Sequence, residues 1–131
     1  MRHFVQYHHP DRDDHPCELS GEFLIYTNKP YPMLAGLLGN TVWLIAGEGT
    51  PRRYSLAYTF VVDEIGAAAD PVFRWYARGS EGRLFEPPPR LDGDPWFGQF
   101  LRRNANFSLG LREMHENDVV QLSRMLFRVT A

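Results

Sequence analysis

Residues 37–65 read LLGNTVWLIAGEGTPRRYSLAYTFVVDEI, and this stretch decides the fold. An apolar run through Trp43 leads into the turn Gly47–Gly49, and a second, longer apolar run follows. Glycines between two strand-like runs are typical of a hairpin, whereas a phosphate-binding loop leads into a helix. The stretch therefore predicts two antiparallel strands joined by a glycine turn.

The second strand of this hairpin alternates bulky and small side chains with the period of two that strands have. At about a dozen residues it exceeds the usual strand length of roughly five or six, and long strands bend through bulges in small barrels. We expect either a small curved β-barrel or a two-faced sheet with a helix on its small face. The bulky face holds Tyr54, Leu56, Tyr58, Phe60 and Val62, and the small face holds Ser55, Ala57 and Thr59.

The remaining sequence predicts strands first and helices last. Asp94 followed by Pro95 is a helix start, since Asp caps helices and Pro suits the first turn. This order favours an α+β fold of one domain over residues 1–131, with short helices, one or two of them C-terminal. The predicted strands are 2–8, 22–27, 71–78 and 107–111, and the predicted helical segments are a turn at 33–38 and a last helix capped by Asn117 or Asp118.

Composition limits the functions open to the chain. A formal net charge of −2 argues against strong nonspecific binding to duplex nucleic acid, which depends on phosphate neutralisation. The single cysteine, Cys17, permits no internal disulfide and fits a reducing compartment. The N-terminal residues lack a signal-like apolar core, and no run approaches the roughly 20 apolar residues of a membrane span. We therefore expect a cytoplasmic protein with no membrane contact.

Titratable side chains crowd the segment that follows the first predicted strand. Together with His8 at the end of that strand, it contains three histidines, three aspartates and a cysteine, which are residue types that bind divalent metals. Their spacing matches no structural zinc motif, and the only distant histidine is His115. A solvated loop is the simpler interpretation, so we expect no metal, no cofactor and no enzyme. The alternative is a small metal-dependent hydrolase or nuclease that uses His8, Asp11 or His115.

Aromatic and basic residues at predicted strand ends suggest a binding site instead. Tyr26 and Asn28 lie just before Pro30, where one offers a ring and the other an amide able to read a base edge. Trp43 offers a second ring, although its apolar strand also suits a core tryptophan. Cations in the flanking loops suit phosphate contacts. The candidate nucleic-acid-binding residues are Tyr26, Asn28, Lys29, Trp43, Arg52 and Arg53.

The order of these segments resembles the PUA-like superfamily, and its EVE branch in particular. In EVE domains a short helix, a Gly-Asp pair, an apolar strand, a Gly-rich turn and a long strand with an acidic end build the small barrel. Here Gly39–Asn40 occupies the place of the Gly-Asp pair, and Asp63–Glu64 forms the acidic end. The resemblance extends over residues 1–111, with its specific part at 37–65. It implies binding to DNA or RNA, with a modified base held in an aromatic pocket.

These observations together predict a noncatalytic nucleic-acid-binding module. Tyr26 and Trp43 would stack on a base, Asn28 would read its edge, and the three cations would hold phosphates. A third class of function is a protein-interaction subunit of a larger system with an effector protein as its partner. The aromatic stripe of the helix that begins at Asp94 would then form the interface.

Overall fold

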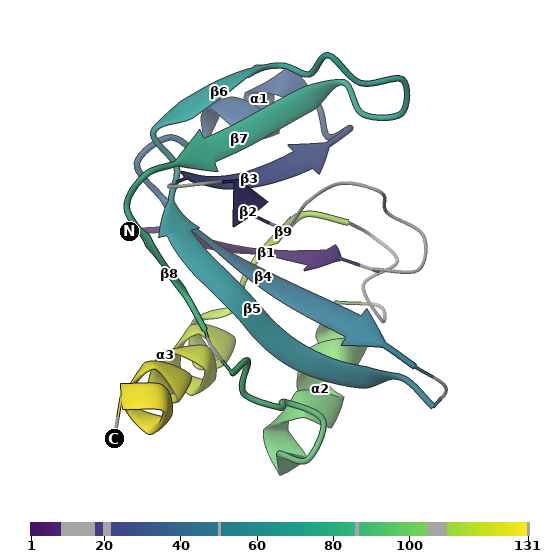
Figure 1. Ribbon diagram of the computed structural model, residues 1–131, viewed down its shortest axis with the longest axis vertical. Coiled ribbons are helices and arrows are strands. Elements are labelled where there is room, and N and C mark those ends of the chain that lie inside the picture. Colours follow the sequence, from purple (N-terminus) through teal and green to yellow (C-terminus); the bar gives the residue numbers. More distant parts are fainter. Residues whose placement is uncertain (9–17, 20–21, 50, 86, 105–109, 131) are drawn as a thin grey trace.

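The computed structural model describes residues 1–8, 18–19, 22–49, 51–85, 87–104 and 110–130, and it confirms the mixed α+β class. Strands dominate the first two thirds of the described chain, and two of its three helices lie in the last third (Figure 1). The elements are β1 (His3–His8), β2 (Glu18–Leu19), β3 (Glu22–Thr27), α1 (Tyr31–Ala35), β4 (Thr41–Glu48), β5 (Arg53–Val61), β6 (Glu64–Ala67), β7 (Trp75–Gly79), β8 (Gly82–Leu84), α2 (Pro95–Arg103), β9 (Arg112–Glu113) and α3 (Glu116–Thr130).

The strands form two sheets. The larger sheet has the order β8-β5-β4-β1-β9, with β1 parallel to β4 and its other pairs antiparallel. The smaller sheet has the order β2-β3-β7-β6 and is antiparallel throughout. The predicted hairpin is confirmed as β4 and β5, and Gly49 in its turn has the positive φ of 82° that favours glycine.

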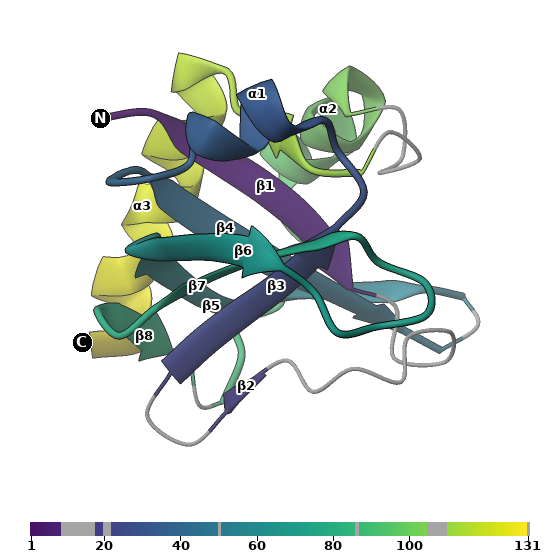
Figure 2. The same cartoon turned by 90° about the horizontal axis from the view of Figure 1, so that it is seen from above.

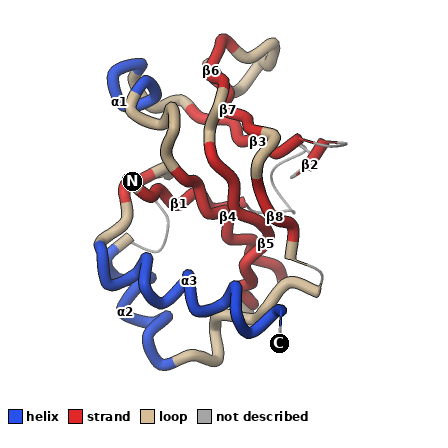
Figure 3. The backbone as a smooth tube through the Cα atoms, turned by 90° about the vertical axis from the view of Figure 1, so that its left-hand side faces the viewer, coloured by secondary structure: helices blue, strands red, loops and turns tan. Residues whose placement is uncertain are grey.

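Both faces of the larger sheet are covered. Helices α2 and α3 lie together on one face, and the smaller sheet with α1 lies on the other (Figures 1 and 3). Neighbouring residues of one strand therefore enter different cores. Val5 packs into the helix-side core, for example, while Phe4 packs into the core between the sheets. This arrangement explains why β4 reads as a continuous apolar run instead of an alternating one.

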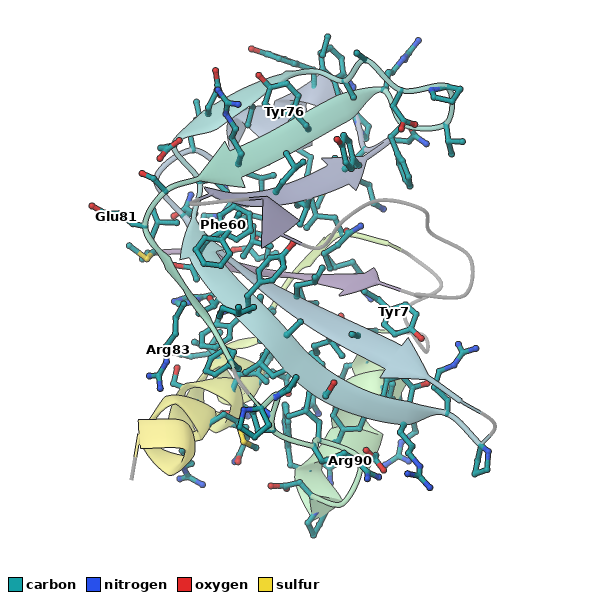
Figure 4. All side chains as sticks on the ribbon, viewed as in Figure 1. Tyr7, Phe60, Tyr76, Glu81, Arg83 and Arg90 are labelled. Carbon is teal, nitrogen blue, oxygen red and sulfur yellow. The ribbon has the colours of Figure 1, made fainter. Side chains whose placement is uncertain are left out.

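A β-bulge in β5 corrects the predicted single bulky face. Ile45 pairs with Leu56 and Leu44 pairs with Tyr58, so Ala57 is an extra residue on this strand. An extra residue reverses the alternation, which sends Leu56 to the helix side while Tyr58 faces the smaller sheet. Leu56, Tyr58, Phe60 and Val62 are buried, but they belong to two different cores. Phe60 follows Tyr58 into the space between the sheets (Figure 4).

The predicted closed barrel is not confirmed, because the described strands form two separate sheets. The long strand predicted to reach Ile65 ends at Val61, and β6 then joins the smaller sheet. The sheets come closest where β7 passes the end of β5. A Cβ added at Gly79 would collide there with the carbonyl oxygen of Val61. Glycine is the residue that permits this approach.

Helix α2 begins as the sequence indicates, whereas α1 begins two residues before the predicted turn at 33–38. Asp94 caps α2 by accepting a hydrogen bond from the backbone N–H of Trp96 at 3.1 Å, and Pro95 is the first helical residue. The last helix begins at Glu116, and Asp118 is a buried ion-pair partner in its first turn where a cap was predicted. Within the described residues, no helix combines the length and apolar content needed to cross a bilayer.

Candidate functional site

The candidate site is a pocket of about 380 Å³ where β1 and β3 end. It lies on the side of the larger sheet that faces the smaller sheet, because Gln6 alternates in phase with Phe4. A hydrogen bond of 3.3 Å from Gln6 Nε2 to the carbonyl oxygen of Tyr26 joins the two sheets at this point. The lining residues are Gln6, Thr27, Asn28, Lys29, Phe73, Gly110 and Leu111.

Gln6 contributes a polar side chain to the pocket lining. Its Nε2 donates to Tyr26, which fixes the orientation of the amide. Its Oε1 is buried and has no hydrogen-bond partner among the residues that the structure describes. A buried acceptor without a donor costs roughly 1–3 kcal/mol.

Phe73 is the aromatic wall of the pocket, and a rigid loop positions it. The carboxylate of Asp70 accepts the backbone N–H groups of Val72 and Phe73, each at 2.8 Å. The ring of Phe73 stacks with the ring of Tyr26 at a centroid distance of 5.9 Å and an interplanar angle of 24°. Tyr26, the predicted stacking residue, therefore contributes through its contact with the pocket ring.

Asn28 fastens the same loop to the end of β3. Its Nδ2 donates to the carbonyl oxygen of Val72 at 3.0 Å, and its Oδ1 accepts the backbone N–H of Arg74 at 2.7 Å. Both ends of the amide are thus engaged with the protein. Asn28 therefore holds the pocket wall, and its predicted role as a reader of a base edge stays a prediction that would use the remaining N–H and oxygen lone pair of this exposed amide.

Lys29 gives the pocket its positive charge. Its backbone N–H donates to the Thr27 hydroxyl at 3.1 Å, which holds the chain in a tight turn after β3. A Cβ added at Gly110 would lie 3.6 Å from Lys29 Cε, so the lysine stem runs close to that glycine. Lys29 makes no ion pair with any other described residue. Its ammonium is available to an anion at the pocket.

Trp43, the second predicted stacking residue, is buried at 2% exposure in the helix-side core. Its indole N–H donates to Nδ1 of His3 at 3.0 Å, and the two rings stack. Trp43 and the pocket lie on opposite sides of the larger sheet, because Trp43 shares a face with Ile45 and not with Leu44. The predicted pairing of Trp43 with Tyr26 around one base is therefore corrected.

Arg52 and Arg53 lie apart from the pocket, at the tip of the hairpin formed by β4 and β5 (Figure 1). The guanidinium of Arg52 sits 6.0 Å from the ring centroid of Tyr7, a cation–π contact on the helix side of the sheet. Figure 4 shows Tyr7 beside this hairpin. Of the six predicted residues, the structure gathers Tyr26, Asn28 and Lys29 at one place.

A second pocket, of about 430 Å³, lies at the other end of β5. Asp63 and Glu81 line it, and the Asp63 carboxylate accepts hydrogen bonds from the backbone N–H and hydroxyl of Ser80 at 3.0 and 3.2 Å. Two carboxylates repel a phosphate, so this pocket is a poor site for nucleic acid. The contrast in charge favours the first pocket, which we call the Lys29 pocket, as a site for nucleic acid.

Sequence reasoning missed Gln6, Phe73 and Gly110, each of which lines the pocket. The alternation of β1 does place Gln6 among apolar residues that face inward, and a polar residue at such a position is a usable signal. Residues 9–17, which hold the His/Asp cluster apart from His8 at the end of β1, and residues 107–109 of a predicted strand lie outside the described residues. Among the residues that are described, no three His, Cys, Asp or Glu side chains gather as metal ligands do.

Comparisons of the chain with protein families, with curated proteins and with solved structures found no match. The site must therefore be interpreted from its own chemistry.

Proposed function

We propose that this protein is a noncatalytic nucleic-acid-binding module that holds a base in the Lys29 pocket. The observation that carries the proposal is the convergence of three chemistries on one pocket: an aromatic ring from Phe73, a polar amide from Gln6 and a cation from Lys29. A nucleotide offers the complement of each, namely a π face, base N–H groups and a phosphate.

The loop that carries the pocket ring is held by hydrogen bonds within the protein itself. Asp70 and Asn28 fix the loop that carries Phe73 through four hydrogen bonds to backbone groups. A preorganised wall lowers the entropy lost on binding. This rigidity supports recognition of one base shape, and a modified base in DNA or RNA is the ligand that we propose, in keeping with the resemblance of residues 37–65 to PUA-like, EVE-like domains.

The arginines of the hairpin fit a supporting role in this proposal. Arg52 and Arg53 are exposed at the tip, where they would contact only a part of the nucleic-acid backbone that extends away from the pocket. Such contacts add affinity that salt weakens, without adding sequence preference. No observation in the described residues favours the hydrolase or the protein-interaction alternative.

The test is a binding panel at low salt with DNA and RNA oligonucleotides that carry unmodified and modified bases. We expect at least one oligonucleotide to bind more tightly than about 100 µM, the weak end of nonspecific binding. Lys29→Gln should weaken binding roughly tenfold and reduce the salt dependence by about one phosphate contact. Arg102→Gln is the matched control, because it removes the same charge from an exposed position on α2.

Two results would contradict the proposal. One is the absence of binding to every oligonucleotide at that threshold. The other is equal weakening by Lys29→Gln and Arg102→Gln, which would mean that total charge and not the pocket determines affinity. Phe73→Ala, checked for folding by its thermal midpoint, distinguishes a stacking site from a purely electrostatic one, because it removes the ring and leaves every charge in place.

A further inference from the structure

Tyr31, the first residue of α1, is an exposed aromatic side chain with an aromatic support. It is 55% exposed, and its ring lies 5.5 Å from the ring of Trp75 at 56°. Trp75 begins β7 and packs against the core between the sheets. The tyrosine ring is therefore held against a fixed neighbour while much of its surface stays open to solvent.

This aromatic pair stands next to the pocket. Trp75 is the register partner of Thr27, a pocket residue, and Tyr31 follows Lys29 by two positions. Residues two apart have Cα atoms within about 7 Å of each other, so the Tyr31 backbone lies close to the pocket rim. Figure 2 shows the chain turning from the end of β3 into α1 at this side of the smaller sheet.

The charges around the ring indicate which partner suits it. Lys29 is one flanking cation, and Arg74, which is exposed on the loop next to Phe73, is another. Neither side chain forms an ion pair within the described part of the chain. Lys29 precedes Tyr31 by two residues and Arg74 directly precedes Trp75, so the exposed ring has cationic neighbours along both segments that carry the aromatic pair. Such a surface complements an anionic chain that carries planar groups. An apolar protein surface would match the ring and leave both cations without a partner.

We propose that Tyr31, backed by Trp75, stacks on the base next to the one held in the pocket, so that the ligand is a single strand. This inference rests on the proposed function of the Lys29 pocket. Bases of a duplex already stack on each other and are paired, whereas a single strand presents neighbouring bases to two protein surfaces. The pocket and the Tyr31 ring then hold consecutive nucleotides, with Lys29 between them.

Fluorescence anisotropy with single-stranded DNA and RNA of about 12 nucleotides, within the usual site size, tests the inference against the same DNA sequence as a duplex. We expect the single strand to bind more tightly than the duplex. Tyr31→Ala should weaken single-strand binding roughly 5- to 100-fold, the effect of losing one stacked base. Tyr31→Phe should bind like the original chain, and Val120→Ala, which removes another exposed apolar side chain, should have no effect.

The outcomes separate this inference from the function on which it rests. Two results would contradict stacking on Tyr31 but not base binding in the pocket. One is that Lys29→Gln weakens binding while Tyr31→Ala does not. The other is that the duplex binds as tightly as the single strand. An unchanged Tyr31→Ala affinity would leave the exposed ring to a protein partner. If no oligonucleotide binds, both proposals fail. A thermal midpoint for each Tyr31 variant ensures that lost binding is not lost folding.

Discussion

Replacing Asp118 with alanine should destabilise the protein more than the loss of the carboxylate from any other ion pair in the described chain. Asp118 is 1% exposed and joins α3 to α2. It accepts hydrogen bonds from the indole N–H of Trp96 at 2.8 Å and from Nε of Arg103 at 3.0 Å, and Arg103 Nη2 also donates to it. The Asp118 carboxylate in turn raises the pKa of Arg103 through these hydrogen bonds.

The expected loss follows from which groups stay buried. Removing one partner of a buried ion pair costs about 3–5 kcal/mol when the other charge is trapped. Here the Arg103 side chain is 37% exposed and water can reach it, which lowers the cost. The Trp96 N–H loses its acceptor in a half-buried position, which adds roughly 1 kcal/mol. We expect about 2–4 kcal/mol in total, or roughly 10 °C in thermal midpoint for a chain of this length.

Urea and thermal unfolding followed by circular dichroism measure this loss. Glu113→Ala is the control, because Glu113 also pairs bidentately with an arginine, Arg2, but both side chains are about half exposed. We expect the control to lose less than about 1 kcal/mol. If Asp118→Ala and Glu113→Ala lower the free energy of unfolding equally, burial does not determine how much an ion pair stabilises this protein, and the prediction is wrong.

Three further predictions concern backbone space and pH. Gly79→Ala should lower the free energy of unfolding by roughly 1–3 kcal/mol, because the new Cβ clashes with β5. Gly93→Ala is the control and should change this free energy little, because nothing lies within 4 Å of its new Cβ. Urea midpoints of the two variants measure the difference. Gly98→Ala in α2 should stabilise by roughly 0.5–1 kcal/mol, since the helix gains a better former and the added Cβ meets only ordinary contact; a lower midpoint would contradict this. Burial, aided by the charge of the amino terminus, lowers the pKa of His3, whose neutral ring accepts the Trp43 N–H. Protonation then favours the unfolded chain, so stability that is complete above pH 6.5 should fall as the pH drops through the folded-state pKa, and His3→Leu should show a smaller change between pH 8 and pH 5.

Much of the fold follows from local patterns in the sequence. The glycine turn after β4 and the Asp94-Pro95 start of α2 lie where the residue types at these positions predict them. The bulge at Ala57 was beyond prediction, because a bulge depends on the pairing register and not on the strand's own composition. The break after Val61 likewise depends on how the two sheets meet at Gly79.

The candidate site was predictable only in the residues that end β3. Lys29 and its neighbours lie at a strand end that a proline marks, and the structure places them at the pocket. Phe73 and Gly110 reach the same pocket from segments distant in sequence, and only the packing of the two sheets brings them there. Trp43 shows the converse limit, because strand alternation fixes its face but does not say which core lies on that face.

The most direct test of the central claim is an amide NMR titration of the isotope-labelled chain with the single-stranded oligonucleotide that binds best. We expect the largest chemical-shift changes at Thr27, Lys29 and Gly110, around the pocket. Little change should occur at Gly39 and Ser80, which line the acidic pocket at the other end of β5. Changes confined to that acidic end, or no change at saturating oligonucleotide, would contradict the claim that this pocket holds a base.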